Sequence, residues 1–376
     1  MSSSSKPAEA ARPRPHRDEM SPKRILTTGN EAIGYGAIAA GCRFFCGYPI
    51  TPQNEIPAFF AQELPKHGGT FVQTESEISS INMLLGVAAT GMRGITSTSS
   101  PGFSLMQEGM SAIHALQLPA VVVNVQRGGP GSGSIASAQT DYLLATKSAG
   151  HGGVKSIVLA PASVQECHDL VQLAFFLSDQ YRILAVVLSD AIIGQSAEVL
   201  EISTLEFGEL PKKTWALRGS AEKRGVRIIM DSYMPFNYGA YFQGIRKKLE
   251  QIEAQEVRFE GRSLEDAELL VVSWGSTART SLEAILQART QGIRVGLFRP
   301  IALFPFPKAA LQAAAAQAKK VLVVEDNQGQ MLYDVEWALG RAIPISFLGI
   351  EKRDLTSGMG LLYPQPVLDE IQRLAS

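Results

Sequence analysis

Short apolar runs alternate along the chain with longer segments in which apolar residues recur at helical spacing. The runs predict strands at 43–47, 70–73, 94–97, 120–125, 156–159 and 183–188. The longer segments predict helices at 30–41, 53–64, 78–90, 103–116 and 163–177. Because strands and helices alternate and several strands are apolar throughout, the pattern predicts a parallel sheet covered by helices on both faces.

This alternation stops in a charge-rich stretch, residues 208–265, which holds one expected helix at 238–253. We predict a connecting segment here, between a first domain of residues 23–207 and a second α/β domain of residues 266–376. The second domain is expected to contain strands at 269–273, 292–297, 321–325 and 344–348, and helices at 280–291, 308–318 and 330–341. Residues 1–22 are rich in Ser, Pro, Ala and Arg, and predict a disordered tail.

One strand end leads into Tyr48-Pro49-Ile50-Thr51-Pro52. Its two prolines predict a rigid turn, with Thr51 as the cap of the next helix. A binding role, in which the Thr51 hydroxyl and backbone amides face a ligand, is compatible with this turn. About one helix later, Glu75 and Glu77 precede an apolar helix. The helix dipole alone favours acids in a first turn. Alternatively, one carboxylate enters an apolar cleft and holds a ring nitrogen protonated, and Glu77 suits that role better because the helix behind it is free of charge.

Another strand runs into the glycine-rich loop Gln126-Arg127-Gly128-Gly129-Pro130-Gly131. This is either a surface loop with a solvated arginine or a site in which Arg127 grips a carboxylate, since ligands bind at the carboxyl ends of parallel strands. Phosphate binding by the glycines is a third alternative. A P-loop is excluded, because no Gly-Lys-Ser/Thr follows.

Size and charge exclude several classes of protein. The chain has 376 residues, 45% of them hydrophobic, which is enough for two domains with their own cores. A net charge of −1 gives no field to attract nucleic acid or an anionic membrane, and no apolar run reaches the roughly 20 residues of a membrane span. The three cysteines include no Cys-x-x-Cys pair, so we expect reduced, buried thiols and a cytoplasmic protein without its own iron–sulfur cluster.

Several of these motifs together resemble the α subunit of the 2-oxoacid:ferredoxin oxidoreductases. In the first domain they are 47–57, Glu75-Ser76-Glu77, Ser99-Ser100-Pro101-Gly102 and 126–131. The stretches Gln139-Thr140-Asp141-Tyr142, 145–147, 150–152 and 159–166 are more similar to the branched-chain (2-ketoisovalerate) branch than to the 2-oxoglutarate branch. In the second domain, 299–301, 304–307 and 324–331 resemble the transketolase C-terminal-like domain of the same family.

The resemblance implies a pyrimidine-binding domain of the thiamine-diphosphate-binding fold, followed by the smaller transketolase C-terminal-like domain. It places the acid that pairs with the aminopyrimidine of thiamine diphosphate on Glu77, substrate contacts on Thr51 and Arg127, and further cofactor contacts on Tyr48, Pro49 and Ile50. The implied reaction is oxidative decarboxylation of a 2-oxoacid to acyl-CoA and CO₂, with electrons passed to ferredoxin.

The resemblance also implies partners. The chain lacks a Gly-Asp-Gly segment followed by Asn, the pattern that holds the diphosphate through a divalent metal. We therefore expect a β subunit to carry the diphosphate-binding domain and Mg²⁺, and gamma and ferredoxin-like subunits to carry iron–sulfur clusters. The alternatives are a 2-oxoglutarate or 2-oxobutyrate enzyme, or a non-catalytic scaffold subunit of the same fold.

Overall fold

The computed structural model describes residues 23–148, 150–219, 238–352 and 362–376, so the predicted tail at 1–22 lies outside the described residues. The first domain is built on a seven-stranded sheet of order β12-β6-β7-β5-β4-β2-β3. Its strands are β2 (Phe44–Gly47), β3 (Thr70–Gln73), β4 (Gly94–Thr98), β5 (Ala120–Gln126), β6 (Ile157–Leu159), β7 (Leu184–Asp190) and β12 (Ala302–Phe304). All pairs are parallel except β12 with β6, which confirms the predicted parallel sheet.

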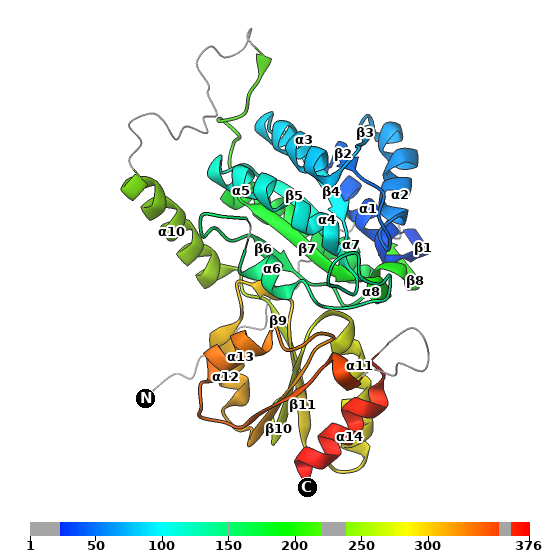
Figure 1. Ribbon diagram of the computed structural model, residues 1–376, viewed down its shortest axis with the longest axis vertical. Helices are drawn as coiled ribbons and strands as arrows, with labels where there is room; N and C mark the ends of the chain where they lie inside the picture. The colour runs from blue at the N-terminus through cyan, green and yellow to red at the C-terminus, as the bar shows by residue number, and fades with distance from the viewer. Residues whose placement is uncertain (1–22, 149, 220–237, 353–361) are drawn as a thin grey trace.

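Helices cover both faces of this sheet (Figure 1). They are α1 (Gly29–Ala39), α2 (Glu55–Glu63), η1 (Leu64–His67), α3 (Glu77–Ala89), α4 (Ser100–Leu105), α5 (Gln107–Ala115), α6 (Tyr142–Thr146), α7 (Val164–Tyr181) and α8 (Ala191–Gln195). The single helix expected at 103–116 is divided into α4 and α5 at Met106. Helix α1 approaches α7 closely at Gly36, where a Cβ would lie only 2.3 Å from the backbone oxygen of His168.

A two-stranded antiparallel ribbon was not predicted. It pairs β1 (Lys23–Thr28) with β8 (Ala197–Ile202). Its directly opposed residues Leu26 and Val199 are 73% and 64% exposed, so the ribbon does not carry the apolar-in, polar-out alternation that indicates a half-buried strand.

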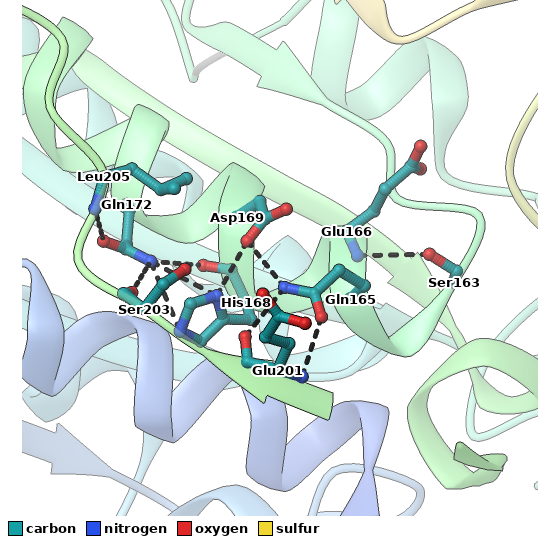
Figure 2. Close-up of polar contacts among 9 residues, drawn as sticks. All are labelled: Ser163, Gln165, Glu166, His168, Asp169, Gln172, Glu201, Ser203 and Leu205. Carbon is teal, nitrogen blue, oxygen red and sulfur yellow. Dashed lines mark hydrogen bonds and ion pairs between the residues drawn. The ribbon is translucent and has the colours of Figure 1, made fainter. Parts of the chain in front are cut away.

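Helix α7 fixes the last part of β8 and the chain that follows it (Figure 2). The Gln165 amide accepts from the Glu201 backbone nitrogen (2.9 Å) and donates to its backbone oxygen (3.2 Å). About two helical turns later, the Gln172 amide accepts from the Leu205 nitrogen (3.0 Å) and donates to the Ser203 oxygen (3.1 Å). A side-chain amide has the donor and acceptor of a peptide group, so the two glutamines pair with the chain as a neighbouring strand would.

The second domain contains a five-stranded sheet of order β14-β13-β10-β11-β9. Its strands are β9 (Phe259–Arg262), β10 (Leu269–Ser273), β11 (Val295–Pro300), β13 (Lys320–Val324) and β14 (Ile345–Leu348). Its helices are α11 (Gly275–Thr290), α12 (Lys308–Ala315), α13 (Leu332–Leu339), η2 (Ile350–Lys352) and α14 (Pro364–Ala375). Strand β9 pairs antiparallel with β11, so this sheet takes in a strand that the predicted boundary at residue 266 leaves out.

The larger of two hydrophobic cores among the described residues runs through both domains, and the smaller lies within the second domain. Strand β12 comes from the second half of the chain but pairs with β6 of the first sheet. The fully buried Trp274 and Phe298 belong to the same cluster of buried residues as the strands of the first domain. The connecting segment contributes α10 (Tyr238–Gln255), which lies beside the first domain (Figure 1). No helix in the described part of the chain has both the length and the apolar character that a membrane crossing requires.

Candidate active site

Four neighbouring strands of the first sheet end at one edge. In the order β5-β4-β2-β3 they are parallel, so their carboxyl ends lie side by side. Arg127 follows β5, Ser99 and Ser100 follow β4, the Tyr48–Pro52 turn follows β2, and Glu77 follows β3 after three residues. The edge where ligands bind in such sheets therefore carries the predicted site residues.

The turn after β2 is held from beneath by two buried amides. Asn30 Nδ2 donates to the backbone oxygen of Pro52 (2.9 Å). Gln53 Nε2 donates to the oxygen of Tyr48 (3.1 Å), and Gln53 Oε1 accepts from Ser97 Oγ of β4 (2.5 Å). Both amide side chains are completely buried, so the turn is fixed to the neighbouring helix and strand.

Thr51 does not cap the following helix. Helix α2 begins at Glu55, with Asn54 at its N-cap and no side-chain capping bond. Instead, Asn54 Nδ2 donates to Thr51 Oγ1 (3.3 Å). The predicted capping role of Thr51 is therefore wrong, because the helix starts too late for its hydroxyl to reach the first free amides.

The two neighbouring acids differ in surroundings. Glu75 is exposed, and a hydrogen bond from Ser79 Oγ lowers the pKa of its carboxyl. Glu77 begins α3, whose N-cap Ser76 accepts from the Ser79 amide, and is only 4% exposed. Among the described residues, no hydrogen bond or ion pair engages the Glu77 carboxylate.

The Glu77 carboxylate lies against the first turn of α4. A Cβ placed on Gly102 would be 2.3 Å from Glu77 Oε1 and 2.1 Å from Thr98 Oγ1. Only a glycine leaves room for the acid at this point. A buried carboxylate without a protein partner is costly unless something else binds it, which fits an acid that awaits a ligand's nitrogen.

Arg127 and Thr51 are brought together. Arg127 Nη1 donates to the backbone oxygen of Thr51 (2.9 Å), and Nη2 donates to the oxygen of Ser132 in the glycine-rich loop (2.7 Å). Its Nε is buried and has no hydrogen-bond partner within the described residues. Two of the five guanidinium donors are thus used by backbone oxygens of the chain itself.

Sequence reasoning missed a buried acid next to this arginine. Asp141, 7% exposed, accepts from Ser100 Oγ (2.6 Å) and Asn124 Nδ2 (2.9 Å). Ser100 Oγ also accepts from the Arg127 backbone nitrogen (3.1 Å). Burial raises the pKa of the Asp141 carboxyl, while these hydrogen bonds act in the opposite direction. Its only sequence signal is its place in the stretch Gln139-Thr140-Asp141-Tyr142.

The remaining predicted cofactor contacts lie at the rim. Tyr48 and Pro49 are exposed, and Ile50 and Thr51 are half-buried. Cys42, Cys46 and Cys167 are free and buried, as expected. The described residues contain no group of three or more His, Cys, Asp or Glu side chains that could bind a metal ion.

Two family models cover most of the chain. "Pyruvate flavodoxin/ferredoxin oxidoreductase, thiamine diP-bdg" matches residues 35–260, and "Pyruvate:ferredoxin oxidoreductase core domain II" matches residues 267–357. The ketoisovalerate oxidoreductase subunit VorB of Methanothermobacter marburgensis is 42% identical over 320 residues, which are 84% of this chain and 90% of VorB. The 2-oxoglutarate synthase subunit KorA of Methanothermobacter thermautotrophicus is 36% identical over 335 residues, 82% of this chain and 89% of KorA.

Solved structures show the same fold. A 2-oxoglutarate:ferredoxin oxidoreductase from Magnetococcus marinus, with 2-oxoglutarate, coenzyme A and succinyl-CoA bound, superposes with a TM-score of 0.80 at 28% identity. That match covers 94% of this chain but 65% of the other. A split-gene transketolase in an inactive β4 tetramer, at 14% identity and a TM-score of 0.56, shares the fold alone. The chain therefore belongs to the 2-oxoacid:ferredoxin oxidoreductase family, as a subunit whose first domain is of the thiamine-diphosphate-binding type.

Proposed function

We propose that this chain is the α subunit of an enzyme that oxidatively decarboxylates a branched-chain 2-oxoacid, 2-ketoisovalerate, to acyl-CoA and CO₂ with ferredoxin as electron acceptor. The observation that carries the proposal is the buried carboxylate of Glu77, which has no partner in the part of the chain that the structure describes and lies on the same sheet edge as the Arg127–Thr51 pair. An acid and a cation placed on one rigid rim can serve a cofactor ring and a substrate carboxylate at once.

The residues present fit the pyrimidine half of thiamine diphosphate. Glu77 would hold a proton at the ring nitrogen, and Tyr48, Pro49 and Ile50 would line the ring from the turn after β2. When bound, thiamine diphosphate supplies the electron sink that decarboxylation of a 2-oxoacid requires. The chain's part is to keep the acid dry and fixed in place, which the close contact at Gly102 accomplishes.

Arg127 would bind the carboxylate of the 2-oxoacid, and Thr51 would lie beside it. The guanidinium is already oriented by two backbone oxygens, so little side-chain freedom is lost when substrate binds. The second N–H of each Nη atom is not used by these bonds and would donate to the substrate carboxylate.

A β subunit would hold the diphosphate, its Mg²⁺ and the other half of the site. Exposed apolar side chains on α3, the helix that Glu77 begins, and on α4 support a docked partner: Ile78 and Met83 of α3 are 51% and 40% exposed, and Leu105 of α4 is 51% exposed. The matched relatives are named as subunits of larger enzymes. Gamma and ferredoxin-like subunits would carry the iron–sulfur clusters.

Glu77→Gln tests the proposal in the assembled complex. Loss of a proton-holding acid should lower kcat by about 10²- to 10⁴-fold. Glu75→Gln is the matched control, because Glu75 lies two residues away but is exposed, and it should leave the rate unchanged. A Glu77→Gln rate within about threefold of wild type would instead support the scaffold alternative. The isolated chain should show no turnover.

The substrate is tested by comparing 2-ketoisovalerate, 2-oxobutyrate and 2-oxoglutarate. The higher identity to VorB than to KorA, 42% against 36%, favours the branched-chain substrate. 2-Oxoglutarate carries a second carboxylate, which needs a further cation or hydrogen-bond donors to bind well. The highest kcat/KM with 2-oxoglutarate would replace the branched-chain assignment and leave the reaction class intact.

A further inference from the structure

Two groups of buried hydrogen bonds, joined by the main chain from Gln139 to Asp141, connect the second domain to Arg127. It starts at Gln139, which is completely buried. Its backbone nitrogen donates to the Asp326 oxygen (2.9 Å), and its backbone oxygen accepts from Asn327 Nδ2 (2.7 Å). Its Nε2 donates to the Trp274 oxygen (2.8 Å), and its Oε1 accepts from the Asp326 nitrogen and from Thr277 Oγ1, both at 3.0 Å. The second domain thus supplies hydrogen-bond partners for both the backbone and the side chain of Gln139.

These contacts of Trp274, Thr277, Asp326 and Asn327 with Gln139 form a clamp. Asp141 lies two residues after Gln139. Its backbone nitrogen donates to Gln126 Oε1 (3.0 Å), and its carboxylate accepts from Ser100 and Asn124. No cation forms an ion pair with Asp141 among the residues that the structure describes. Burying an acid without a counter-ion costs free energy, and the hydrogen bonds that this carboxylate accepts offset that cost and fix the neighbouring side chains.

The Ser100 hydroxyl links the Asp141 carboxylate to the main chain of Arg127. It has one proton, and the Asp141 oxygen at 2.6 Å is a closer and stronger acceptor than the Arg127 carbonyl at 3.2 Å. With its proton directed to Asp141, the hydroxyl offers its lone pairs to the Arg127 amide at 3.1 Å. The carboxylate therefore orders the hydroxyl, and the hydroxyl fixes the main chain from which the guanidinium extends.

We propose that Asp141 is a positioning residue for Arg127, acting through Ser100 and held in place by the clamp of the second domain on Gln139. The proposal rests on the proposed role of Arg127 as the group that binds the 2-oxoacid carboxylate. It gives the second domain a part in substrate binding, although none of its residues needs to touch the substrate.

The test is the KM for the 2-oxoacid measured in the assembled complex. Asp141→Ala removes the acceptor and should raise KM about tenfold, with kcat changed less than about threefold. Asp141→Asn keeps a neutral acceptor and should raise KM by less, about threefold. Ser100→Ala should resemble Asp141→Ala, and Ser100→Thr, which restores the hydroxyl, should return KM to within about twofold of wild type.

A matched control separates positioning from general stability. Asp179 is buried to the same extent as Asp141, at 7% exposure, but it binds Arg93 and Lys213 at the far end of α7. Asp179→Ala should lower the melting temperature and leave KM unchanged. If Asp141→Ala also lowers stability while leaving KM within about twofold of wild type, the residue is merely structural and the proposal is wrong.

Arg127→Lys distinguishes failure of this proposal from failure of the proposed function. It should raise KM by at least tenfold, because the bidentate grip is lost. In that background, Asp141→Ala should add less than about twofold, since both changes act on one contact. An unchanged KM in Arg127→Lys would refute the role of Arg127 itself. A raised KM in Arg127→Lys together with an unchanged KM in Asp141→Ala would refute only the positioning role.

Discussion

Replacing Gly102 by alanine tests the geometry around Glu77 without altering the acid. Helix α4 brings Gly102 so close that a Cβ would lie 2.1 Å from Thr98 Oγ1 and 2.3 Å from Glu77 Oε1. Ordinary contacts of carbon with its neighbours are about 3.5–4.0 Å long. The carboxylate and the helix must therefore separate by about 1 Å or more in Gly102→Ala.

The effect on rate should exceed the effect on folding. A displacement of about 1 Å in a reacting constellation costs about 10²-fold in rate, which is about 2.7 kcal/mol of transition-state stabilisation. Crowding a packed site costs about 1–3 kcal/mol of stability, and the better helix propensity of alanine returns up to about 1 kcal/mol. The variant should thus still fold and assemble, with kcat reduced about 10²-fold.

The assay is ferredoxin reduction that depends on the 2-oxoacid, with thermal unfolding measured in parallel. Gly244→Ala is the matched control, because Gly244 also lies within a helix, α10, but a Cβ there meets no atom within 4 Å. Its rate should equal that of wild type. A Gly102→Ala complex that assembles normally and turns over within about threefold of wild type would refute the inference that the Glu77 carboxylate must stay where the structure places it.

Three further predictions concern the fold. Burial raises the pKa of the Cys42 and Cys46 thiols to about 12, so both should resist alkylation at about pH 8 until urea unfolds the chain, and rapid labelling of the folded protein would contradict this. Burial lowers the pKa of His114 to about 3; its contribution to stability is therefore complete above about pH 6.5 and falls by up to about 1.4 kcal/mol per unit as the pH drops towards 3. Urea titrations should show that the free energy of unfolding of His114→Gln falls less steeply with decreasing pH than that of wild type. An equally steep fall in both proteins would refute this prediction. Arg299→Lys should lower the free energy of unfolding by about 1–3 kcal/mol, because the 4% exposed guanidinium binds Glu166 through two bonds of 2.8 and 2.6 Å; a change below about 0.5 kcal/mol would refute this.

The central strands and their helices could be predicted because burial on both faces makes a strand apolar throughout. Strand β5 is an example, with all seven residues buried. The ribbon of β1 and β8 could not be found this way, since its cross-strand pair Leu26 and Val199 faces outward. Strand β9 was missed for a similar reason: its four residues are half-buried or exposed, and its place is set by pairing with β11.

The site shows the same division. The common location of Glu77, Thr51 and Arg127 follows from the rule that strand ends in a parallel sheet converge, whereas their roles come from the family resemblance and stay predictions. The contacts of Gln53 and Asp141 could not be predicted in this way, because the function of a buried polar residue depends on the group that it contacts. Gln53 meets Ser97 from 44 residues away, and Asp141 meets Ser100 from 41 residues away. Nothing in the local pattern distinguishes such a residue from a solvated one.

The junction between the domains decides how the second domain can act on the site. Two separate domains joined by a small polar contact would be expected to move against each other. Here β12 completes the first sheet, and Trp274 is buried in the shared core. The second domain also supplies the hydrogen-bond partners of the Gln139 side chain. Separating the domains would expose this core and leave the amide groups of Gln139 unpaired, which costs several kcal/mol. The second domain is therefore a fixed support of the first sheet. The positioning role proposed for Asp141 accordingly requires constant placement of Arg127 by a rigid junction, and it requires no movement of one domain against the other.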